Sequence, residues 1–294
     1  MVKLTILIIG CGDIGINLGR ELLDEGHQVI GLRRNVEALK GTGIKPLKLD
    51  LNDLEDANAA SLPHADYVVY TVSADRFEES AYQSAYPDGL KNVLKVMEQH
   101  KKPPRRIFFV SSTSVYGQQE GEAVNEESPT ESTSFSGNLM CDAEQALINH
   151  TLPGTVIRFS GIYGPGRDRL IHQVAEGRVA AITPVIYSNR IHRDDCTGII
   201  AHLIRYQESG QTPSDVYLGS DCEPVTMHNV MMWLAKQLKV DATNTMQSPL
   251  RRRTSKRCDN QRVLDTGYQF RFPSYREGYA QVLKEGGFLE VNKA

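Results

Sequence analysis

A glycine-rich loop near the amino terminus constrains the fold more than any other feature of the sequence. The apolar run Lys3–Ile9 has the length of a buried strand, and the loop Gly10–Gly15, which reads GCGDIG, follows it directly. The next segment, Ile14–Glu25, repeats its apolar residues at helical spacing. A strand, a Gly-x-Gly-x-x-Gly turn and a helix in this order predict the first unit of a dinucleotide-binding α/β fold.

Each position of this loop has a physical role in holding a dinucleotide. Gly10 permits a tight turn, Gly12 lets the backbone approach a pyrophosphate, and Gly15 lets the helix pack on the strand. Asp13 and Ile14 open the helix, whose positive end would face the pyrophosphate. A purely structural glycine turn is the alternative, and the position at the first strand-to-helix junction favours the dinucleotide site.

Short apolar strands alternate with helical patterns through the first half of the chain. The predicted strands are Lys3–Ile9, Gln28–Leu32, Ile44–Leu49, Asp66–Val72, Arg106–Ser111 and Gly154–Phe159. The predicted helices are Ile14–Glu25, Phe77–His100, with a break expected at Pro87, and Phe135–His150. This alternation predicts βαβ units and a doubly wound parallel sheet of the Rossmann type.

The pattern becomes irregular after Ser160, where we predict a helix over Cys196–Tyr206, a strand over Asp215–Leu218 and an amphipathic helix over Val225–Leu238. We expect residues 1–160, completed by about 188–222, to form the dinucleotide-binding domain. The segments 161–187 and 223–294 are expected to form a smaller substrate-binding lobe.

Composition narrows the class of protein. The 294 residues carry a formal net charge of -3, with 40% apolar and 23% charged residues, as in ordinary soluble globular proteins. This balance gives no reason to expect nucleic acid or a membrane as partner. The five cysteines form no Cys-x-x-Cys pair, so we predict neither a metal site nor a redox pair, and expect a cytoplasmic location.

The end of the second predicted strand discriminates between the two nicotinamide dinucleotides. An NAD site usually carries an acidic residue there, which binds the ribose hydroxyls. This strand ends with Arg33 and Arg34 instead, and guanidinium groups suit a 2′-phosphate. We therefore predict NADP, with NAD as the alternative cofactor and two solvated arginines as the structural alternative.

A segment after the fifth predicted strand carries a family resemblance. Phe108–Gly117, which reads FFVSSTSVYG, resembles the serine-bearing strand of the extended short-chain dehydrogenase/reductases, the sugar-nucleotide epimerase/dehydratase group. Three later segments, Val156–Gly166, Ile191–Asp195 and Tyr217–Gly219, resemble that family in the same order. The resemblance extends to about residue 240 and points to an atypical, NAD-dependent epimerase/dehydratase-like member.

The resemblance also implies a catalytic Tyr-x-x-x-Lys pair, which this chain lacks. Aligned on Ala143 and Glu144, Ser136 takes the place of the tyrosine and Met140 that of the lysine. The chain has no lysine between Lys102 and Lys236, so a small shift of the alignment does not restore the pair. An alkyl hydroxyl holds its proton too tightly to act as the phenol would.

The family pattern implies that Ser112 binds the substrate oxygen. Tyr116 and Tyr163 are candidate proton donors, with core packing as the alternative for each. His192 is a third candidate, for which a structural hydrogen-bonding role is favoured. Asp195 is expected to anchor the following helix.

Further residues are expected to line the cofactor by the same resemblance. Asp50 matches the position near the adenine, although capping a helix that begins near Asn52 is an almost equal alternative. The remaining predicted cofactor contacts are Leu51, Thr71, Ser73 and Ser160.

These observations predict an NADP-dependent oxidoreductase or epimerase/dehydratase-like enzyme acting on a carbonyl or hydroxyl group. The partner is a small molecule, for which a nucleotide-linked sugar is one candidate, and relatives suggest a homodimer built on helices Phe77–His100 and Phe135–His150.

The basic run Arg251–Arg253 with Lys256 and Arg257 is either a solvated loop or a phosphate clamp. The rival hypothesis is a non-catalytic NADP(H)-binding redox sensor. A different Rossmann dehydrogenase is a third, which the Ser112 and Tyr163 segments weaken.

Overall fold

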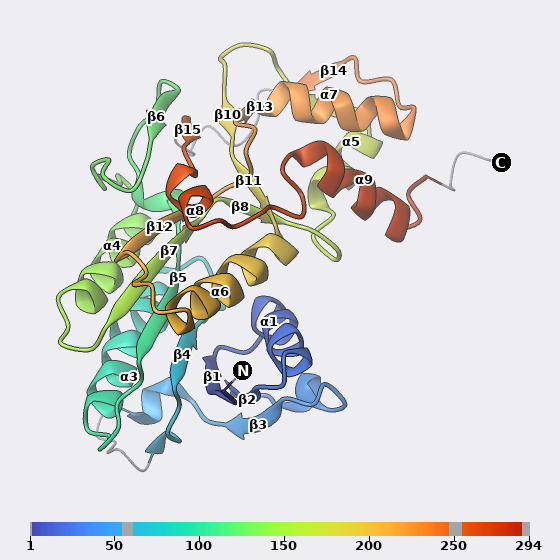
Figure 1. The fold of residues 1–294 in the computed structure, drawn as a ribbon. Helices are drawn as coiled ribbons and strands as arrows, with labels where there is room; N and C mark the ends of the chain where they lie inside the picture. Colours follow the sequence, from blue (N-terminus) through green and yellow to red (C-terminus); the bar gives the residue numbers. More distant parts are fainter. Residues whose placement is uncertain (1, 55–60, 247–254, 290–294) are drawn as a thin grey trace. The chain divides into compact units, whose positions relative to one another are not determined.

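A parallel sheet forms the centre of the dinucleotide-type fold in this computed structural model, which describes residues 2–54, 61–246 and 255–289. Within these residues its seven strands run in the order β12-β7-β5-β4-β1-β2-β3 (Figure 1). The strands are β1 (Thr5–Ile9), β2 (Gln28–Arg33), β3 (Lys45–Lys48), β4 (Tyr67–Tyr70), β5 (Arg106–Ser112), β7 (Gly154–Phe159) and β12 (Val216–Gly219). The prediction of a doubly wound Rossmann-type sheet is confirmed.

Helices cover both faces of this sheet. They are α1 (Asp13–Asp24), α2 (Glu79–Gln83), α3 (Gly89–Glu98), α4 (Phe135–Ile148) and α6 (Arg193–Glu208), with single turns η1 (Glu37–Leu39), η2 (Leu51–Leu54) and η5 (Thr113–Val115). Figure 1 shows α3 and α4 on one side of the sheet and α1 and α6 on the other. The ion pair between Arg205 and Glu25 joins α6 to the end of α1.

Burial explains why the central strands lack an alternating polar pattern. Four of the five residues of β1 and all four of β4 are buried. A strand covered by helices on both faces must be apolar throughout, and its sequence therefore reads as a continuous run.

The long helical stretch between β4 and β5 is interrupted where a proline was expected to break it. Pro87 lies in η4 (Ser84–Asp88), a turn of π-helix between α2 and α3. Proline has no N–H to donate, and a π-turn is one way to accommodate it. The Tyr70 hydroxyl donates to the carbonyl of Ala85 at 2.5 Å, which ties this turn to the sheet.

The chain divides into two compact units. The first consists of Met1–Val115, Ser132–Arg158 and Thr197–Tyr217, and the second of Tyr116–Glu131, Phe159–Cys196 and Leu218–Ala294. The segment Tyr116–Glu131 thus lies outside the first unit, although the sequence analysis assigns it to the dinucleotide-binding domain. The reason is β6 (Glu122–Val124), which pairs in parallel with β15 (Lys256–Cys258) of the second unit. Which unit binds cofactor and which binds substrate remains a prediction.

The second unit contains short strand pairs and four helices within its described residues. They are β8 (Gly161–Tyr163), α5 (Arg169–Ala175), β9 (Arg178–Ala180), β10 (Tyr187–Ser188), β11 (Arg190–His192), β13 (Val225–Thr226), α7 (Met227–Leu238), β14 (Asn244–Met246), α8 (Gln261–Asp265) and α9 (Tyr275–Glu285). The predicted helix over Val225–Leu238 corresponds to α7, and Thr226 caps it by accepting from the Asn229 N–H.

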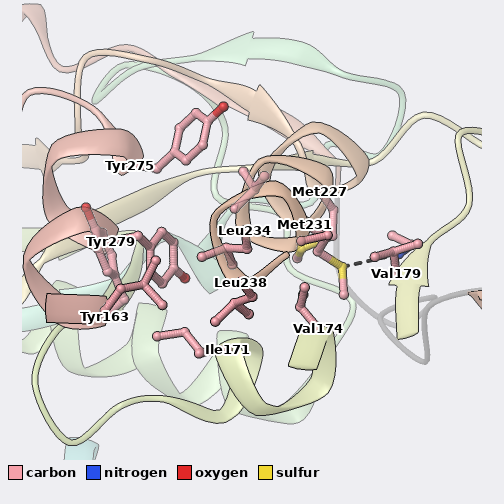
Figure 2. Close-up of a cluster of buried hydrophobic side chains, with 14 of the residues drawn as sticks. Tyr163, Ile171, Val174, Val179, Met227, Met231, Leu234, Leu238, Tyr275 and Tyr279 are labelled. Carbon is pink, nitrogen blue, oxygen red and sulfur yellow. Dashed lines mark hydrogen bonds between the residues drawn. The ribbon is translucent and has the colours of Figure 1, made fainter. Parts of the chain in front are cut away.

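An apolar cluster holds α5, α7 and α9 together. Figure 2 shows side chains of these helices meeting in one core, with the Tyr163 and Tyr279 rings together. The centroids of these two rings are 4.4 Å apart in a stacked arrangement. The Met231 sulfur accepts from the backbone N–H of Ala180 at 3.2 Å, which connects α7 to β9. Tyr275 and Tyr279 of α9 are therefore core residues of this unit.

Candidate functional site

The glycine loop has the backbone geometry that its sequence requires. Gly10 has a φ of +78°, and a Cβ at this position would lie 2.6 Å from the backbone of Val72. Gly15 faces the side chains of Ile8 and Thr71 closely enough that a Cβ would crowd them. Only glycine meets both conditions, because it alone lacks a Cβ and tolerates a positive φ.

Hydrogen bonds hold the loop at the edge of the sheet. The backbone N–H groups of Gly10 and Cys11 both donate to the Leu32 carbonyl at 3.0 Å. The Thr71 hydroxyl lies 3.1 Å from the Ile9 carbonyl and 3.0 Å from that of Gly10. Thr71, predicted as a cofactor contact, therefore fixes the shape of the loop.

Gly12 differs from its neighbours in facing open space. A Cβ built on it would meet nothing nearer than the Gly10 carbonyl oxygen, at 3.7 Å. Its φ of -96° is outside the left-handed region, whereas its ψ of -141° lies beyond the ordinary β range. Helix α1 begins at the next residue, Asp13, and its first-turn N–H groups lack intrahelical acceptors. An open glycine at a helix N-terminus fits a pyrophosphate.

The two arginines at the end of β2 have different surroundings. Arg33 Nη1 donates to the Cys11 carbonyl at 3.2 Å, so its guanidinium lies against the glycine loop. Arg34 Nη2 lies 2.7 Å from both carboxylate oxygens of Asp75, and both side chains of this pair are 60% exposed. Arg33 is therefore the better placed of the two to contact a ligand at the loop.

Two more of the predicted cofactor contacts lie next to η2. Asp50 Oδ1 accepts from the backbone N–H of Asn52 at 3.1 Å, which is the capping arrangement considered for it. Leu51 is partly buried at the start of η2, and its carbonyl accepts from the Asn92 side chain at 3.3 Å. Ser73 is exposed in the segment after β4.

Ser112 ends β5, at the carboxyl edge of the sheet. Its Oγ accepts from the backbone N–H of Ser114 at 3.1 Å. Among the described residues no acceptor receives the Ser112 hydroxyl proton. This side chain can therefore donate to an oxygen supplied from outside the protein.

A buried ion pair is hydrogen-bonded to the residue that precedes Ser112. This residue, Ser111, donates to Glu144 Oε1 at 2.5 Å. Glu144 of α4 also accepts from Arg158 of β7, with Nη2 to Oε2 at 2.7 Å and Nε to each oxygen at 3.1 Å. Glu144 is 1% exposed and Arg158 4%, so the pair is removed from water. The sequence analysis missed this pair, which a charged residue inside the apolar strand Gly154–Phe159 could have revealed.

Tyr116 is fully buried in the second unit. Its hydroxyl donates to the carbonyl of Asn125 at 2.8 Å, and Lys256 Nζ lies 5.7 Å from the ring centroid. Nζ also donates to the Tyr116 carbonyl at 3.3 Å. This environment favours the packing alternative for Tyr116.

Tyr163 is also a core residue. Its hydroxyl lies 3.5 Å from the Ser274 carbonyl, at the start of α9. Burial raises the pKa of this phenol, with nearby Asp221 adding to the effect. A phenol that holds its proton more tightly is a weaker acid, so packing is favoured here too.

Comparisons with known proteins agree with this geometry. The sequence model of the NAD dependent epimerase/dehydratase family matches residues 6–219. The chain belongs to this family. Protein YeeZ of Escherichia coli strain K12 is 31% identical over 220 residues, which cover 70% of this chain and 74% of YeeZ.

Solved structures of similar fold cover nearly the whole chain. One, from Methylobacillus flagellatus and described as an NAD-dependent epimerase/dehydratase, has 36% identity and a TM-score of 0.81, covering 97% of this chain and 100% of that one. The human epimerase family protein SDR39U1, solved with NADPH, has 21% identity and a TM-score of 0.77, covering 95% of this chain and 99% of its own. The human protein shows a shared fold.

Helix α4 carries Ser136 and Met140, which were expected from the sequence to take the places of a catalytic tyrosine and lysine. The Ser136 hydroxyl lies 3.2 Å from that of Ser134, which caps the helix by accepting from the Gly137 N–H. Met140 is buried. Neither side chain supplies a titratable group at this position.

His192 and Asp195 have structural partners. His192 is fully buried against Phe272, and its Nδ1 accepts from the Asp194 N–H at 3.2 Å. Asp195 accepts from the Tyr268 hydroxyl at 2.8 Å and from the N–H groups of Arg271 at 2.7 Å and Phe272 at 3.0 Å. The Asp195 carboxylate thus fastens the segment 268–272 to the start of α6.

Ser160 and the basic run complete the predicted residues. Ser160 is buried and donates to the Ser220 hydroxyl at 3.1 Å within the second unit. Arg251–Arg253 lie outside the described residues. Lys256 is buried, and burial lowers its pKa to about 8, while Arg257 donates to the Gly121 carbonyl at 2.9 Å. These two described members of the run are therefore not simple solvated charges.

The described residues contain neither a candidate metal-binding cluster nor a candidate membrane span. No group of three or more His, Cys, Asp or Glu side chains is arranged to hold a metal ion. No helix in the described ranges is both long and apolar enough to cross a membrane.

Proposed function

We propose that this protein is a nicotinamide-dependent oxidoreductase or epimerase-like enzyme that acts on a carbonyl or hydroxyl group of a small molecule. The observation that carries the proposal is the Ser112 hydroxyl, which donates to no acceptor among the described residues. Ser112 ends β5, and the open glycine loop follows β1. Only β4 separates these two parallel strands, so their carboxyl ends share one edge of the sheet. Ligands of such sheets bind at this edge, beside the switch point of the strand order.

The roles of individual residues follow from their surroundings. Gly12 and the N-terminus of α1 would hold the pyrophosphate, and Ser112 would donate to the substrate oxygen. A nicotinamide bound there would supply or accept a hydride at the substrate carbon. The hydroxyls of Tyr116 and Tyr163 face backbone carbonyls, so we propose water as the source of the proton. Asp50, Leu51, Ser73 and Ser160 stay weaker cofactor candidates.

Removing the Ser112 hydroxyl tests this assignment. We expect Ser112→Ala to lower kcat/KM about 10- to 100-fold, because a hydrogen bond to a developing charge contributes about 1.5–3 kcal/mol. NADPH oxidation with a panel of aldehydes, ketones and keto acids would provide the assay. Tyr116→Phe and Tyr163→Phe should retain activity within about threefold, because a neutral hydrogen bond contributes only about 1 kcal/mol. A large loss in either phenylalanine variant would return the donor role to that tyrosine.

We propose NADP as the preferred cofactor, and the contact of Arg33 with the loop supports this preference. Arg33→Ala is expected to weaken NADP binding about 10- to 100-fold by removing a charge-assisted contact with the 2′-phosphate. NAD lacks that phosphate, so its affinity should change little. Calorimetric titration with both cofactors measures the difference, and Arg34→Ala serves as the neighbouring control. Equal losses for NAD and NADP would show that Arg33 only supports the loop.

The rival function is a redox sensor without catalysis. The sensor hypothesis is favoured because Ser136 and Met140 of α4 have side chains that do not titrate near neutral pH. Such a sensor would bind NADPH and NADP with different affinity and change its oligomeric size, yet transfer no hydride. Turnover of any carbonyl compound that depends on Ser112 would exclude it.

A further inference from the structure

Five buried side-chain atoms in the described part of the second unit have no hydrogen-bond partner. Two are the amide oxygens of Gln118 and Gln281, and the other three are Arg190 Nε, His192 Nε2 and Asp221 Oδ2. The exposed fractions of Arg190, His192 and Asp221 are 7%, 0% and 2%. An unmade hydrogen bond at a buried polar atom is costly, and native proteins contain few of them. The three atoms on titratable groups therefore point to a ligand that the described residues do not provide.

The three residues are connected through the strand β11. Arg190 and His192 are alternate residues of this strand, and alternate side chains project from the same face. The N–H of Asp221 donates to the Arg190 carbonyl at 2.6 Å, which fixes Asp221 beside the strand. The Asp221 charge is also close enough to Arg190 to act on it.

The guanidinium of Arg190 is held in place without a counter-ion. Nη1 donates to the Tyr279 hydroxyl at 3.3 Å, and Nη2 contacts the Met227 sulfur at 3.1 Å. No carboxylate of the described residues forms an ion pair with it. Asp195, the other buried acid nearby, already receives three hydrogen bonds. These contacts orient the Arg190 guanidinium, and no ion pair with a described carboxylate balances its positive charge.

Both other groups can act as donors at neutral pH. Burial raises the pKa of Asp221 to about 8, so its carboxyl group keeps its proton, and Oδ1 accepts from the Glu223 N–H. Burial lowers the pKa of His192 to about 4, so its ring is neutral. Because Nδ1 accepts a hydrogen bond, the ring proton is on Nε2. One cationic donor and two neutral donors match a single negative charge.

We infer that Arg190, Asp221 and His192 form a binding site for the carboxylate of a small organic acid. The site lies within the second unit, and the inference goes beyond the proposed function. A nucleotide diphosphate is a poor match, because it carries more negative charge and has bulky groups on both sides. A terminal carboxylate presents two oxygens and one charge, and it needs access from one direction only. Guanidinium groups suit this geometry.

Binding of lactate to the full-length protein tests the site without requiring turnover. At roughly ten times its Kd, lactate should raise the unfolding midpoint by about 3 °C, and the neutral analogue lactamide should not. Arg190→Met, which keeps the volume and removes the charge, should abolish the shift. Arg178→Met is the matched control, because Arg178 is partly exposed and pairs with Glu176, and it should keep the shift.

The pH dependence provides a second measurement. Deprotonation of Asp221 would place a negative charge beside the ligand, so lactate affinity should fall as the pH rises through about 8. The charged groups that act on Asp221 or His192 are Arg190, Glu223, Asp195, Asp194, Arg193 and Glu285. The charge of Asp221 in turn reaches Tyr163, Tyr275, Tyr279, Cys222 and Cys258. Asp221→Asn keeps a neutral donor and should remove the pH dependence while retaining binding.

Several outcomes would overturn the inference. They are no shift with lactate, an equal shift with lactamide, survival of the shift in Arg190→Met, or a larger shift with phosphate or UDP than with lactate. A crystal structure in lactate that shows only water between Arg190 and Asp221 would do the same. NADP titration separates the two proposals: intact NADP binding without a lactate shift removes this inference alone. Loss of all cofactor binding with an intact lactate shift would remove the proposed function alone.

Discussion

Replacing Glu144 with alanine is expected to destabilise the first unit by about 3–5 kcal/mol. The substitution leaves the Arg158 guanidinium buried without its carboxylate, and breaking a buried pair on one side has a cost of this size. It also removes the acceptor of the Ser111 hydroxyl, next to Ser112. Urea unfolding followed by circular dichroism would measure the loss.

Two controls separate the buried charge from ordinary truncation. The double variant Glu144→Leu with Arg158→Met removes both charges and should recover most of the lost stability, since apolar replacements of buried pairs are often neutral. Asp75→Ala breaks the exposed pair with Arg34 and should cost less than about 1 kcal/mol. If the double variant is as unstable as Glu144→Ala, the effect comes from packing and the electrostatic explanation is wrong.

Gly12→Val should lower the affinity for NADP about 10²- to 10⁴-fold without unfolding the protein. The valine side chain would fill the open space at the N-terminus of α1 and keep the pyrophosphate from the backbone donors there, at about 1.5–3 kcal/mol for each lost contact. The fold should survive the substitution, because the Cβ position of Gly12 is open and its φ is -96°, but its ψ of -141° is unusual for valine and should cost about 1 kcal/mol of stability.

Gly10→Ala gives the opposite pattern at a position two residues away. A Cβ at Gly10 meets the Val72 backbone at 2.6 Å, and φ is +78°, so we expect a loss of about 1–3 kcal/mol or more in stability. Calorimetric titration and urea unfolding of both variants would distinguish the two roles. Tight NADP binding by Gly12→Val would place the cofactor elsewhere, or show that the loop is only structural.

The first unit could be predicted from sequence because its local patterns agree with its tertiary structure. Buried parallel strands require continuous apolar runs, and the loop Gly10–Gly15 requires glycine at two positions for steric reasons. The break at Pro87 follows from the chemistry of proline alone. These signals do not depend on distant residues.

Elements of the second unit could not be predicted in the same way. Strands β6 and β15 have three residues each and are stabilised by each other, although they are far apart in sequence. Helix α9 had a local signal that the sequence analysis did not use, since Ser274 and Glu277 form a capping box. Aspartate at position 195 was expected to anchor a helix, and it does so through the distant segment 268–272.

The candidate site shows the same division. Gly12, Arg33 and Ser112 could be proposed from sequence because each follows a predicted strand, and their roles stay predictions. The buried atoms of Arg190, His192 and Asp221 could not, because only the folded second unit shows that they lack partners. The sequence shows which side chains are polar. Whether each buried polar atom finds a hydrogen-bond partner depends on the packing of the whole unit.

The pairing of β6 with β15 has a consequence for synthesis of the protein. The residues of β6 leave the ribosome long before those of β15, so the strand must wait for a partner near the other end of the chain. Its backbone groups stay available to other strands during that interval. Chaperone dependence and aggregation during expression should therefore respond to changes in β6 more strongly than its three residues would suggest.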